Sequence, residues 1–595
     1  MAMTRRTRLL LATAALLAAA RPAHAQQTGT YTPAARAADS AAALAAFRSN
    51  IGAIHGRDRA AYLRHYLQSP RLARTGPGGV QWGYAGLAGG DPDSWPDTLV
   101  ATHFEVVPVA PGVAYGAYRY RVVQGGSTRG VSERVLVKQP DGSWKVAVST
   151  AFASPGDAPV PAFALTGATI VDGTGAAPRV GTVVMRDGRV ACVGRCEVGA
   201  DVETIDARGK WIVPGLVDAH VHYSQTGWAD GRPDALDLRD RFPYDSTVAD
   251  LERNPERFYR SWLCSGVTAT FDVGGYPWTW GLRARAERST SAPHVAAAGP
   301  LVTPYAPPQL LLPGTQQFMR MESDSVTRAA ARFVTGWGAD ALKVWMVVGA
   351  SAPDTATWVA RLGIAAREAR AARTPLIVHA TNLWAAKHAL RAGAKLLVHS
   401  VDDAPVDEEF LRLAREAGAF YNPTLTVRDG YVQLADRRFR PEGLEMECVD
   451  PGTRRKADLT DSLPAGTPMP AAARERIARG YRTMLANLKR VHDAGIPVAM
   501  GTDAGNPLTL HGPSVYREME AMVEAGMTPM QVLVASTRNG ARAMGREDIG
   551  TLEPGKLADL VVLDADPLAS IGNLRRVALV ARGGELWTRR ELEYR

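Results

Sequence analysis

Val217-Asp218-Ala219-His220-Val221-His222 is an apolar run that ends in two histidines. Four further apolar runs end in residues of the same metal-binding kinds. They are Ala341-Leu342-Lys343, Ile377-Val378-His379, Leu397-Val398-His399 and Val498-Ala499-Met500-Gly501-Thr502-Asp503. Together the five ends supply four histidines, one lysine and one aspartate, which is a ligand set for two divalent cations, with zinc favoured by the histidines.

The two histidines of the first run are two residues apart, so on a strand both side chains face the same side. In a barrel of parallel strands that side opens at the C-terminal mouth, where active sites lie. Asp218 lies two residues earlier on the same face and is predicted to accept an imidazole N–H. A pair of hydrogen-bonded structural histidines is the alternative for this motif taken alone.

Lys343 stands in the otherwise apolar run Ala-Leu-Lys-Val-Trp-Met-Val-Val. Burying an unpaired ammonium is costly, so a lysine there is expected to reach the strand end, to be paired or to be chemically changed. A neutral lysine can take up carbon dioxide as a carbamate whose two oxygens bridge two cations. We predict that Lys343 is carbamylated.

His379 and His399 each close a short apolar strand, and neutral imidazole is a common zinc ligand. Asp503 follows a strand end of small residues, which leaves room for metal and substrate. We predict that Asp503 binds metal and is the catalytic residue that takes and returns a proton. For Gly-Thr-Asp-Ala-Gly taken alone, an ordinary turn is the alternative.

The spacing of apolar runs predicts an α/β fold over residues 214–549. Eight buried strands are expected, separated by amphipathic helices such as 325–336, 358–372 and 407–417, which is the repeat of a (β/α)8 TIM barrel. The strands are expected at 212–219, 268–273, 293–298, 341–347, 375–380, 395–400, 418–423 and 497–502. Short strands on both flanks, 163–213 and 550–595, predict one composite β-sandwich domain.

Residues 37–154 form a separate unit in which helices come first and alternating strands follow, an α+β pattern. Element order and the Arg-Val-Leu-Val and Trp-Lys-Val-Ala-Val endings resemble the NTF2-like (SnoaL-like) cone. Such domains serve as enzymes, ligand-binding modules or dimerisation modules, and a non-catalytic role is favoured here. If the protein forms a homo-oligomer, this domain is the expected assembly surface.

Residues 1–25 resemble an export signal, with Arg5, Arg6 and Arg8 before an apolar stretch and Ala23-His24-Ala25 as the cleavage site. The protein is therefore predicted to be periplasmic or secreted, by a Sec or twin-arginine route, with no stable membrane span. The formal charge is +9, and four arginines lie in the signal. No dense basic tract with interleaved aromatics indicates a nucleic-acid partner.

The chain holds four cysteines, Cys192, Cys196, Cys264 and Cys448. Export permits disulfides, and Cys192 with Cys196 could bridge a tight turn, while free or buried thiols are the alternative. No second close pair of cysteines supports a cysteine zinc site.

Longer motifs resemble the amidohydrolase superfamily, over residues 163–590. These are Pro214-Gly-Leu-Val-Asp-Ala-His-Val-His, Gly501-Thr-Asp-Ala-Gly with His511-Gly512, Ser536-Thr-Arg-Asn-Gly-Ala-Arg and Gly550-Thr-Leu-Glu-Pro-Gly-Lys-Leu-Ala-Asp-Leu-Val-Val-Leu. The similarity is to the binuclear, prolidase-like and imidazolonepropionase-like branch, and Lys343 favours the prolidase-like side.

The resemblance implies that His220, His222 and Asp503 hold one metal, that His379 and His399 hold a second, and that the Lys343 carbamate bridges them. A hydroxide shared by the metals then attacks a polarised carbonyl, and Asp503 passes the proton to the leaving nitrogen. Tyr223 and His511 are the expected substrate contacts.

The predicted function is hydrolysis of a C–N bond in a small molecule, such as an Xaa-Pro dipeptide, an N-acyl amino acid or a cyclic amide. An esterase, lactonase or phosphoester hydrolase on the same site is the alternative, and a ligand-binding module with an inactive barrel is the alternative of another class. Aromatic residues at 276–280 and the apolar loop 304–313 predict an apolar substrate wall. Residues 425–470 predict a long polar insertion, either a lid or a solvated excursion.

Overall fold

The computed structural model describes residues 31–76, 79–90, 98–123, 127–153, 162–199, 202–464 and 469–594. Internal contacts divide the chain into two units, residues 1–158 and 159–595. The predicted export signal lies outside the described residues. Among the helices of the described ranges, none is long and apolar enough to cross a membrane.

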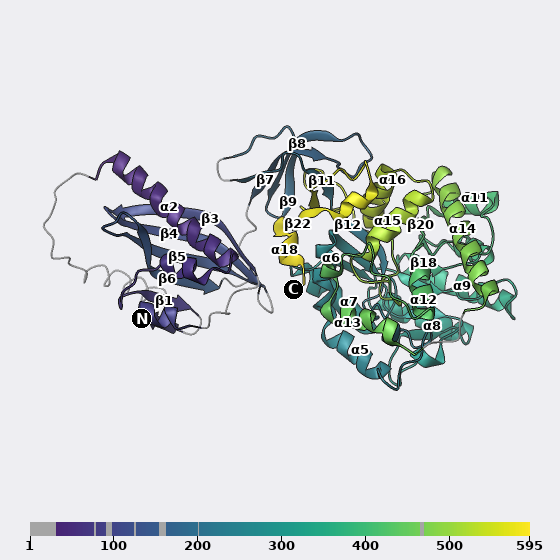
Figure 1. Ribbon diagram of the computed structural model, residues 1–595. Helices are drawn as coiled ribbons and strands as arrows, with labels where there is room; N and C mark the ends of the chain where they lie inside the picture. Colours follow the sequence, from purple (N-terminus) through teal and green to yellow (C-terminus); the bar gives the residue numbers. More distant parts are fainter. Residues whose placement is uncertain are drawn as a thin grey trace, which may run out of the picture. The chain divides into compact units, whose positions relative to one another are not determined.

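The first unit is a curved sheet with one long helix, α2 (Pro33–His55), lying across it (Figure 1). Its strands pair in the order β2-β1-β6-β5-β4-β3. They are β1 (Ala73–Gly76), β2 (Gly79–Trp82), β3 (Thr98–Ala110), β4 (Val113–Val123), β5 (Ser127–Lys138) and β6 (Trp144–Ala153). Helices α3 (Arg59–Arg64) and α4 (Tyr84–Ala88) complete it. Phe47 of α2 packs edge-on against Phe104 and Tyr118 of the sheet, so the predicted α+β element order is present.

Both flanks of the second unit build one eight-stranded sheet, in the order β23-β22-β21-β11-β7-β8-β9, with β10 paired to β7. The strands are β7 (Phe163–Ile170), β8 (Arg179–Arg186), β9 (Arg189–Gly194), β10 (Glu203–Asp206), β11 (Trp211–Pro214), β21 (Leu560–Leu563), β22 (Val577–Arg582) and β23 (Glu585–Thr588). Antiparallel pairing of β11 with β21 joins the two flanks. Segments more than 340 positions apart therefore share one apolar core, which includes Ile212 and Val562.

Parallel strands occupy the middle of the chain, in one three-stranded and one six-stranded sheet. They are β12 (Leu216–Val221), β13 (Val267–Asp272), β14 (His294–Ala297), β15 (Leu301–Thr303), β16 (Phe318–Arg320), β17 (Leu342–Trp345), β18 (Leu376–His379), β19 (Leu396–Val398) and β20 (Phe420–Asn422). Residues 497–504 hydrogen-bond to Tyr421 of β20 on one side and to His220 and His222 on the other. This segment joins β20 to β12, so the strand ends that carry the predicted ligands converge.

Helices separate the parallel strands and cover them (Figure 1). Each turns an apolar face inward; in α8, capped by the Ser323 hydroxyl, the buried side chains are spaced three to four residues apart. The helices are α5 (Tyr244–Arg253), α6 (Tyr259–Cys264), α7 (Trp280–Glu287), α8 (Asp324–Gly336), α9 (Thr355–Ala371), α10 (Leu383–Arg391), α11 (Glu408–Ala417), α14 (Ala471–Asp493), α15 (Ser514–Glu524), α16 (Pro529–Val534) and α17 (Gly540–Ala543).

The first predicted strand, 212–219, is two strands in the structure. Residues up to Pro214 belong to β11 of the eight-stranded sheet, and β12 begins at Leu216. Gly215 lies between them against Thr268, where a side chain would clash. The sequence pattern does not mark this change of sheet, because both strands are buried on both faces and together read as one continuous apolar run.

The insertion after β20 is folded. It contains α12 (Val427–Ala435), α13 (Pro451–Asp458) and two short 3-10 turns, Met446–Cys448 and Leu459–Ser462. Leu434, Phe439 and Val449 pack with Trp228 in a buried cluster, and the Trp228 indole N–H donates to Thr460 Oγ1 at 2.9 Å. The prediction of a solvated excursion is therefore wrong for the described part of the insertion.

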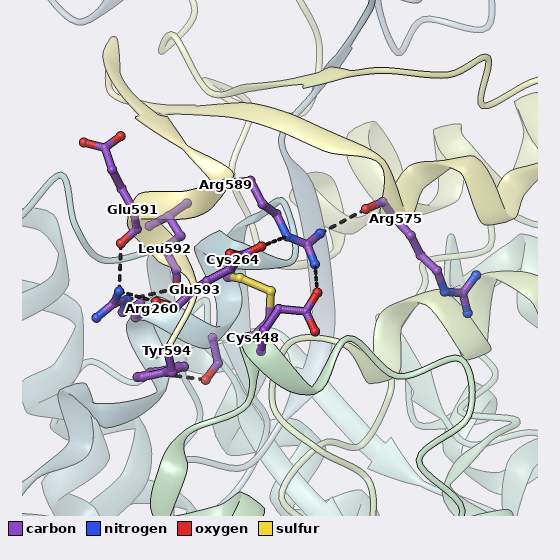
Figure 2. Close-up of a disulfide and its surroundings, with 11 residues drawn as sticks. Arg260, Cys264, Cys448, Arg575, Arg589, Glu591, Leu592, Glu593 and Tyr594 are labelled. Carbon is purple, nitrogen blue, oxygen red and sulfur yellow. Dashed lines mark hydrogen bonds and ion pairs between the residues drawn. A yellow bond between two sulfur atoms is a disulfide. The ribbon is translucent and has the colours of Figure 1, made fainter. Parts of the chain in front are cut away.

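Two disulfides are present, Cys192–Cys196 and Cys264–Cys448. The second joins α6 to the insertion and lies beside the C-terminal turn α18 (Arg589–Leu592), as Figure 2 shows. Arg260, one turn before Cys264, donates to the carbonyl oxygens of Glu591 and Leu592 at 2.9 and 3.0 Å (Figure 2). The insertion is thus anchored covalently, next to the end of the described chain.

Candidate metal centre

Six predicted ligands lie at the C-terminal ends of parallel strands and line one cavity of about 390 Å³. They are His220, His222, Lys343, His379, His399 and Asp503. Lys343 is 2% exposed, and His220 is 1% exposed. Parallel strands end at the same edge of a sheet, so residues that follow one another over nearly 300 positions meet there.

His220, His222 and Asp503 are the closest group of the six. The Nε2 atoms of His220 and His222 lie 3.2 and 2.9 Å from the same oxygen, Asp503 Oδ1. All three residues are buried, and their ligand atoms lie within 4.8 Å of one another. Asp503 has a positive φ of 63°, so its backbone turns sharply to bring the carboxylate back over the histidines.

The outer nitrogens of the two histidines show which ring atom carries the proton. His222 Nδ1 lies 2.6 Å from the carbonyl oxygen of Gly274, which only accepts hydrogen bonds. His220 Nδ1 lies 3.1 Å from Asn422 Oδ1, and the Asn422 amide nitrogen donates to the Ala499 carbonyl, so Oδ1 is an acceptor. Both Nδ1 atoms therefore carry hydrogen, so the neutral form of either ring has its lone pair at Nε2.

These lone pairs converge on a carboxylate oxygen, Asp503 Oδ1, which has no hydrogen-bond donor in the described residues. Burial also lowers the pKa of His220 to about 4, so a second proton on that ring does not supply the missing donor to Asp503 Oδ1 at neutral pH. Three electron-pair donors facing one another in a buried site repel unless a cation lies between them. The residues present therefore suit a divalent metal ion.

His379 and His399 form a second pair beside the first group. Their ring centroids are 4.3 Å apart, and His399 lies 4.9 Å from His220 by the same measure. Burial lowers the pKa of both well below the usual value, so both rings are neutral ligand candidates. His399 Nδ1 is 2.7 Å from Thr424 Oγ1, which fixes the ring.

Lys343 projects from β17 into the same cavity. Burial lowers the pKa of its ammonium to about 7, against the opposing effect of the Asp503 and Asp272 carboxylates. The lowered pKa favours the neutral amine, which carbamate formation requires. Carbamylation itself stays a prediction.

The two predicted substrate contacts do not line the cavity. Tyr223 is fully buried, and its hydroxyl lies 3.1 Å from Thr270 Oγ1. His511 stacks on Phe258 behind the site and contacts the backbone carbonyl of His222 at 3.1 Å. Neither residue lines the cavity, so the geometry gives no support to their predicted contact with substrate.

The predicted role of Asp218 is wrong. Its carboxylate accepts from the backbone N–H of His220 and from Thr502, not from an imidazole. Asn422 occupies the position beside the His220 ring instead. Asn422 and Asp272 also end apolar strands, so the pattern that singled out the six ligands could have found both.

The cavity walls are largely apolar. The apolar lining residues include Leu301, Leu310, Phe318, Trp345, Val427, Val432, Ile477 and Met484. Of the residues expected in the apolar wall, Tyr276 and Trp278 instead pack in a separate cluster with Tyr244, which Leu310 also contacts.

Arg232 is a cation on the cavity wall. Its Nε and Nη2 atoms donate to the two carboxylate oxygens of Asp234, each at 2.8 Å, and Nη1 donates to Asn506 Oδ1. Tyr431 also donates to Asn506 Oδ1, at 2.7 Å. The guanidinium is therefore held in place by its neighbours while part of it faces the cavity.

Comparisons with known proteins point to one enzyme family. A model of the amidohydrolase family matches residues 211–586. Imidazolonepropionase of Geobacillus kaustophilus (strain HTA426) is 26% identical over 390 residues, which are 61% of this chain and 77% of that enzyme.

Solved structures are similar over the same region. That of molinate hydrolase matches with a TM-score of 0.55 and 25% identity, over 72% of this chain and 95% of the other. A Xaa-Pro dipeptidase with bound methionine matches with a TM-score of 0.56 and 22% identity, over 72% of this chain and 100% of the other. Because the family model covers more than half of the chain, the chain belongs to the amidohydrolase family and is a hydrolase that acts on carbon–nitrogen bonds.

Proposed function

We propose that this protein is an exported amidohydrolase with two divalent metal ions, zinc being favoured. His220, His222 and Asp503 would hold one ion, His379 and His399 the other, and a Lys343 carbamate would lie between them. The convergence of two histidine lone pairs on Asp503 Oδ1 is the observation that carries the proposal. Metal ions held there lower the pKa of bound water and polarise a carbonyl group.

The chain's own residues then account for the remaining steps. With a water held at this centre, the Asp503 carboxylate would take its proton and would deliver it to the departing nitrogen. Apolar walls exclude water and hold the substrate's apolar group. Gly274, Asn422 and Thr424 fix the ring orientations on which all of this depends.

We further propose that the substrate carries a carboxylate, as an Xaa-Pro dipeptide or an N-acyl amino acid does. Three N–H groups of Arg232 are engaged by Asp234 and Asn506. A guanidinium has five, so further donors remain for a substrate carboxylate. The apolar lining suits a proline ring or a hydrophobic side chain.

For the fold, we propose a (β/α)8 barrel, a flanking β-sandwich and a non-catalytic NTF2-like domain. The two-sided hydrogen bonding of residues 497–504 supports barrel closure. Export to an oxidising compartment is supported by the four cysteines, which all form disulfides.

Metal analysis tests the centre. Purified protein should contain about two divalent ions per chain, and Lys343→Ala should lower this number. Lys395→Ala is the matched control, because Lys395 is exposed and donates to Ala417 at the opposite end of a parallel strand. An unchanged metal content in Lys343→Ala would reject the bridging role.

A substrate panel tests the bond and the carboxylate. Dipeptides, N-acyl amino acids, lactones and phosphotriesters are assayed with metal and bicarbonate, and each amide substrate is paired with a form whose carboxylate is blocked. Arg232→Met should raise KM about 10-fold or more for the free acids only, as expected for a lost charged hydrogen bond. Activity confined to esters or phosphoesters would reject the amide substrates.

A further inference from the structure

The loop that follows β20 carries the hydroxyl that holds His399. Thr424 Oγ1 is 2.7 Å from His399 Nδ1, and both residues are buried. Both also have a positive φ, 45° for Thr424 and 74° for His399. Such backbone conformations in non-glycine residues cost about 1–3 kcal/mol each and persist only where the surroundings impose them.

Glu518 of α15 supplies that constraint from outside the strand. Its Oε1 accepts from the backbone N–H of Leu425 at 2.8 Å. Its Oε2 accepts from the backbone N–H and the hydroxyl of Thr426, each at 2.9 Å. Glu518 is 0% exposed. Its three hydrogen-bond donors come from Leu425 and Thr426, the two residues directly after Thr424.

The segment held in this way also leads into a cavity wall. Helix α12 begins at Val427, directly after Thr426, and Val427 and Tyr431 of this helix line the cavity. Glu518 itself does not line the cavity. Within the described residues, the hydrogen bonds of Glu518 all go to this loop, so the loop is its direct route to the metal centre.

We propose that Glu518 is a positioning residue for His399, acting through the loop 424–426 and the Thr424 hydroxyl. This inference rests on the metal centre proposed above. The carboxylate holds the loop so that the hydroxyl fixes the His399 ring toward its metal ion. Residues that orient metal-binding histidines typically change metal affinity 10- to 100-fold when replaced.

The test measures metal affinity rather than activity. Equilibrium dialysis with Zn²⁺, and titration with Co²⁺ followed by its visible absorption, give the Kd of each of the two ions. Glu518→Gln replaces one acceptor oxygen by an NH2 donor, so at least one of the three N–H and O–H donors of Leu425 and Thr426 loses its acceptor. We expect the Kd of one ion to rise about 10- to 100-fold and that of the other to stay within about threefold.

A double-mutant cycle tests the route. Thr424→Val removes only the hydroxyl, and it should weaken the same ion. If Glu518 acts through Thr424, then adding Glu518→Gln to Thr424→Val causes little further loss. If the increases in Kd of the two single variants instead multiply in the double variant, the two residues act independently and the proposal is overturned.

Glu591→Gln is the matched control. Glu591 is also a buried carboxylate that accepts from a backbone N–H and a hydroxyl, both of Thr588. It lies in α18 and does not line the cavity. Both glutamine variants should lower Tm, and only Glu518→Gln should change metal affinity. Equal loss of Tm with unchanged affinity in Glu518→Gln would show a merely structural role and overturn the proposal.

The two proposals fail in different ways. If the wild-type protein binds no divalent ion, the metal centre is rejected before any variant is compared. If the wild type binds two ions and the variants do not differ, only the role of Glu518 is rejected. Should Glu518→Gln not fold, Glu518→Asp, which keeps both oxygens one methylene shorter, takes its place with the same expected weakening.

Discussion

The Cys264–Cys448 disulfide should stabilise the second unit much more than Cys192–Cys196 does. In the chain-entropy model, a cross-link removes loop-closure entropy that grows as 1.5R ln n with loop length. The separations are 184 and 4 residues. The two contributions are then about 5 and about 2 kcal/mol, a difference of about 3.4 kcal/mol.

For a unit of this size, these energies correspond to Tm losses of about 6 °C for Cys264→Ala/Cys448→Ala and about 2 °C for Cys192→Ala/Cys196→Ala. Calorimetry of both double variants measures them. Cys264 and Cys448 are also fully buried, so their removal leaves an unfilled volume. Refolding Cys192→Ala/Cys196→Ala in the presence of a phosphine reductant, which reduces the buried cross-link in the unfolded state, removes the long cross-link while both sulfurs remain and isolates the entropic part. A reductant shift no larger than the loss from the short cross-link would refute the loop-length argument.

Three further predictions concern other parts of the second unit. Burial alone would lower the pKa of His294, but its contacts with Asp559, at 2.8 Å, and with a second carboxylate raise it above the ordinary value. Its stabilising effect is then full below about pH 6.5 and is lost as pH rises through the raised pKa, so urea unfolding from pH 6 to 9 should show a decline that His294→Gln lacks. Gly501→Ala should weaken metal binding in dialysis, because the added Cβ would lie 2.7 Å from His220 Cβ. Trp228→Phe should cost about 1–3 kcal/mol in chemical denaturation, since it leaves a buried hydroxyl without its donor.

The strand ends were predictable because apolar runs and parallel topology are local and regular signals. Seven of the eight expected strands coincide with β13, β14, β17, β18, β19, β20 and the segment around Val498 to within a few residues. The error at β12 arose where the chain changes sheet within one apolar run. Tyr223 lies in the turn after β12, which ends at Val221, so the alternation of side chains along the strand does not place it.

The insertion was not predictable from its composition. Polar residues dominate it, yet Trp228 from another loop and Cys264 from α6 provide the partners that fold it. Such partners are set by tertiary contact and not by local pattern. The same holds for the Cys264–Cys448 pairing, because the separation of 184 residues contains no signal of proximity.

The orientation of the ligand side chains is fixed by neighbouring residues that are not ligands. Three of the four imidazoles are oriented by a group from a loop or strand distant in sequence: His222 by Gly274, His220 by Asn422 and His399 by Thr424. A strand-end pattern locates the metal-binding atoms, but it does not fix which nitrogen carries the proton. That choice determines whether Nε2 is free to bind a cation, so the chemistry of this site depends on the neighbouring loops as much as on the strands that carry the histidines.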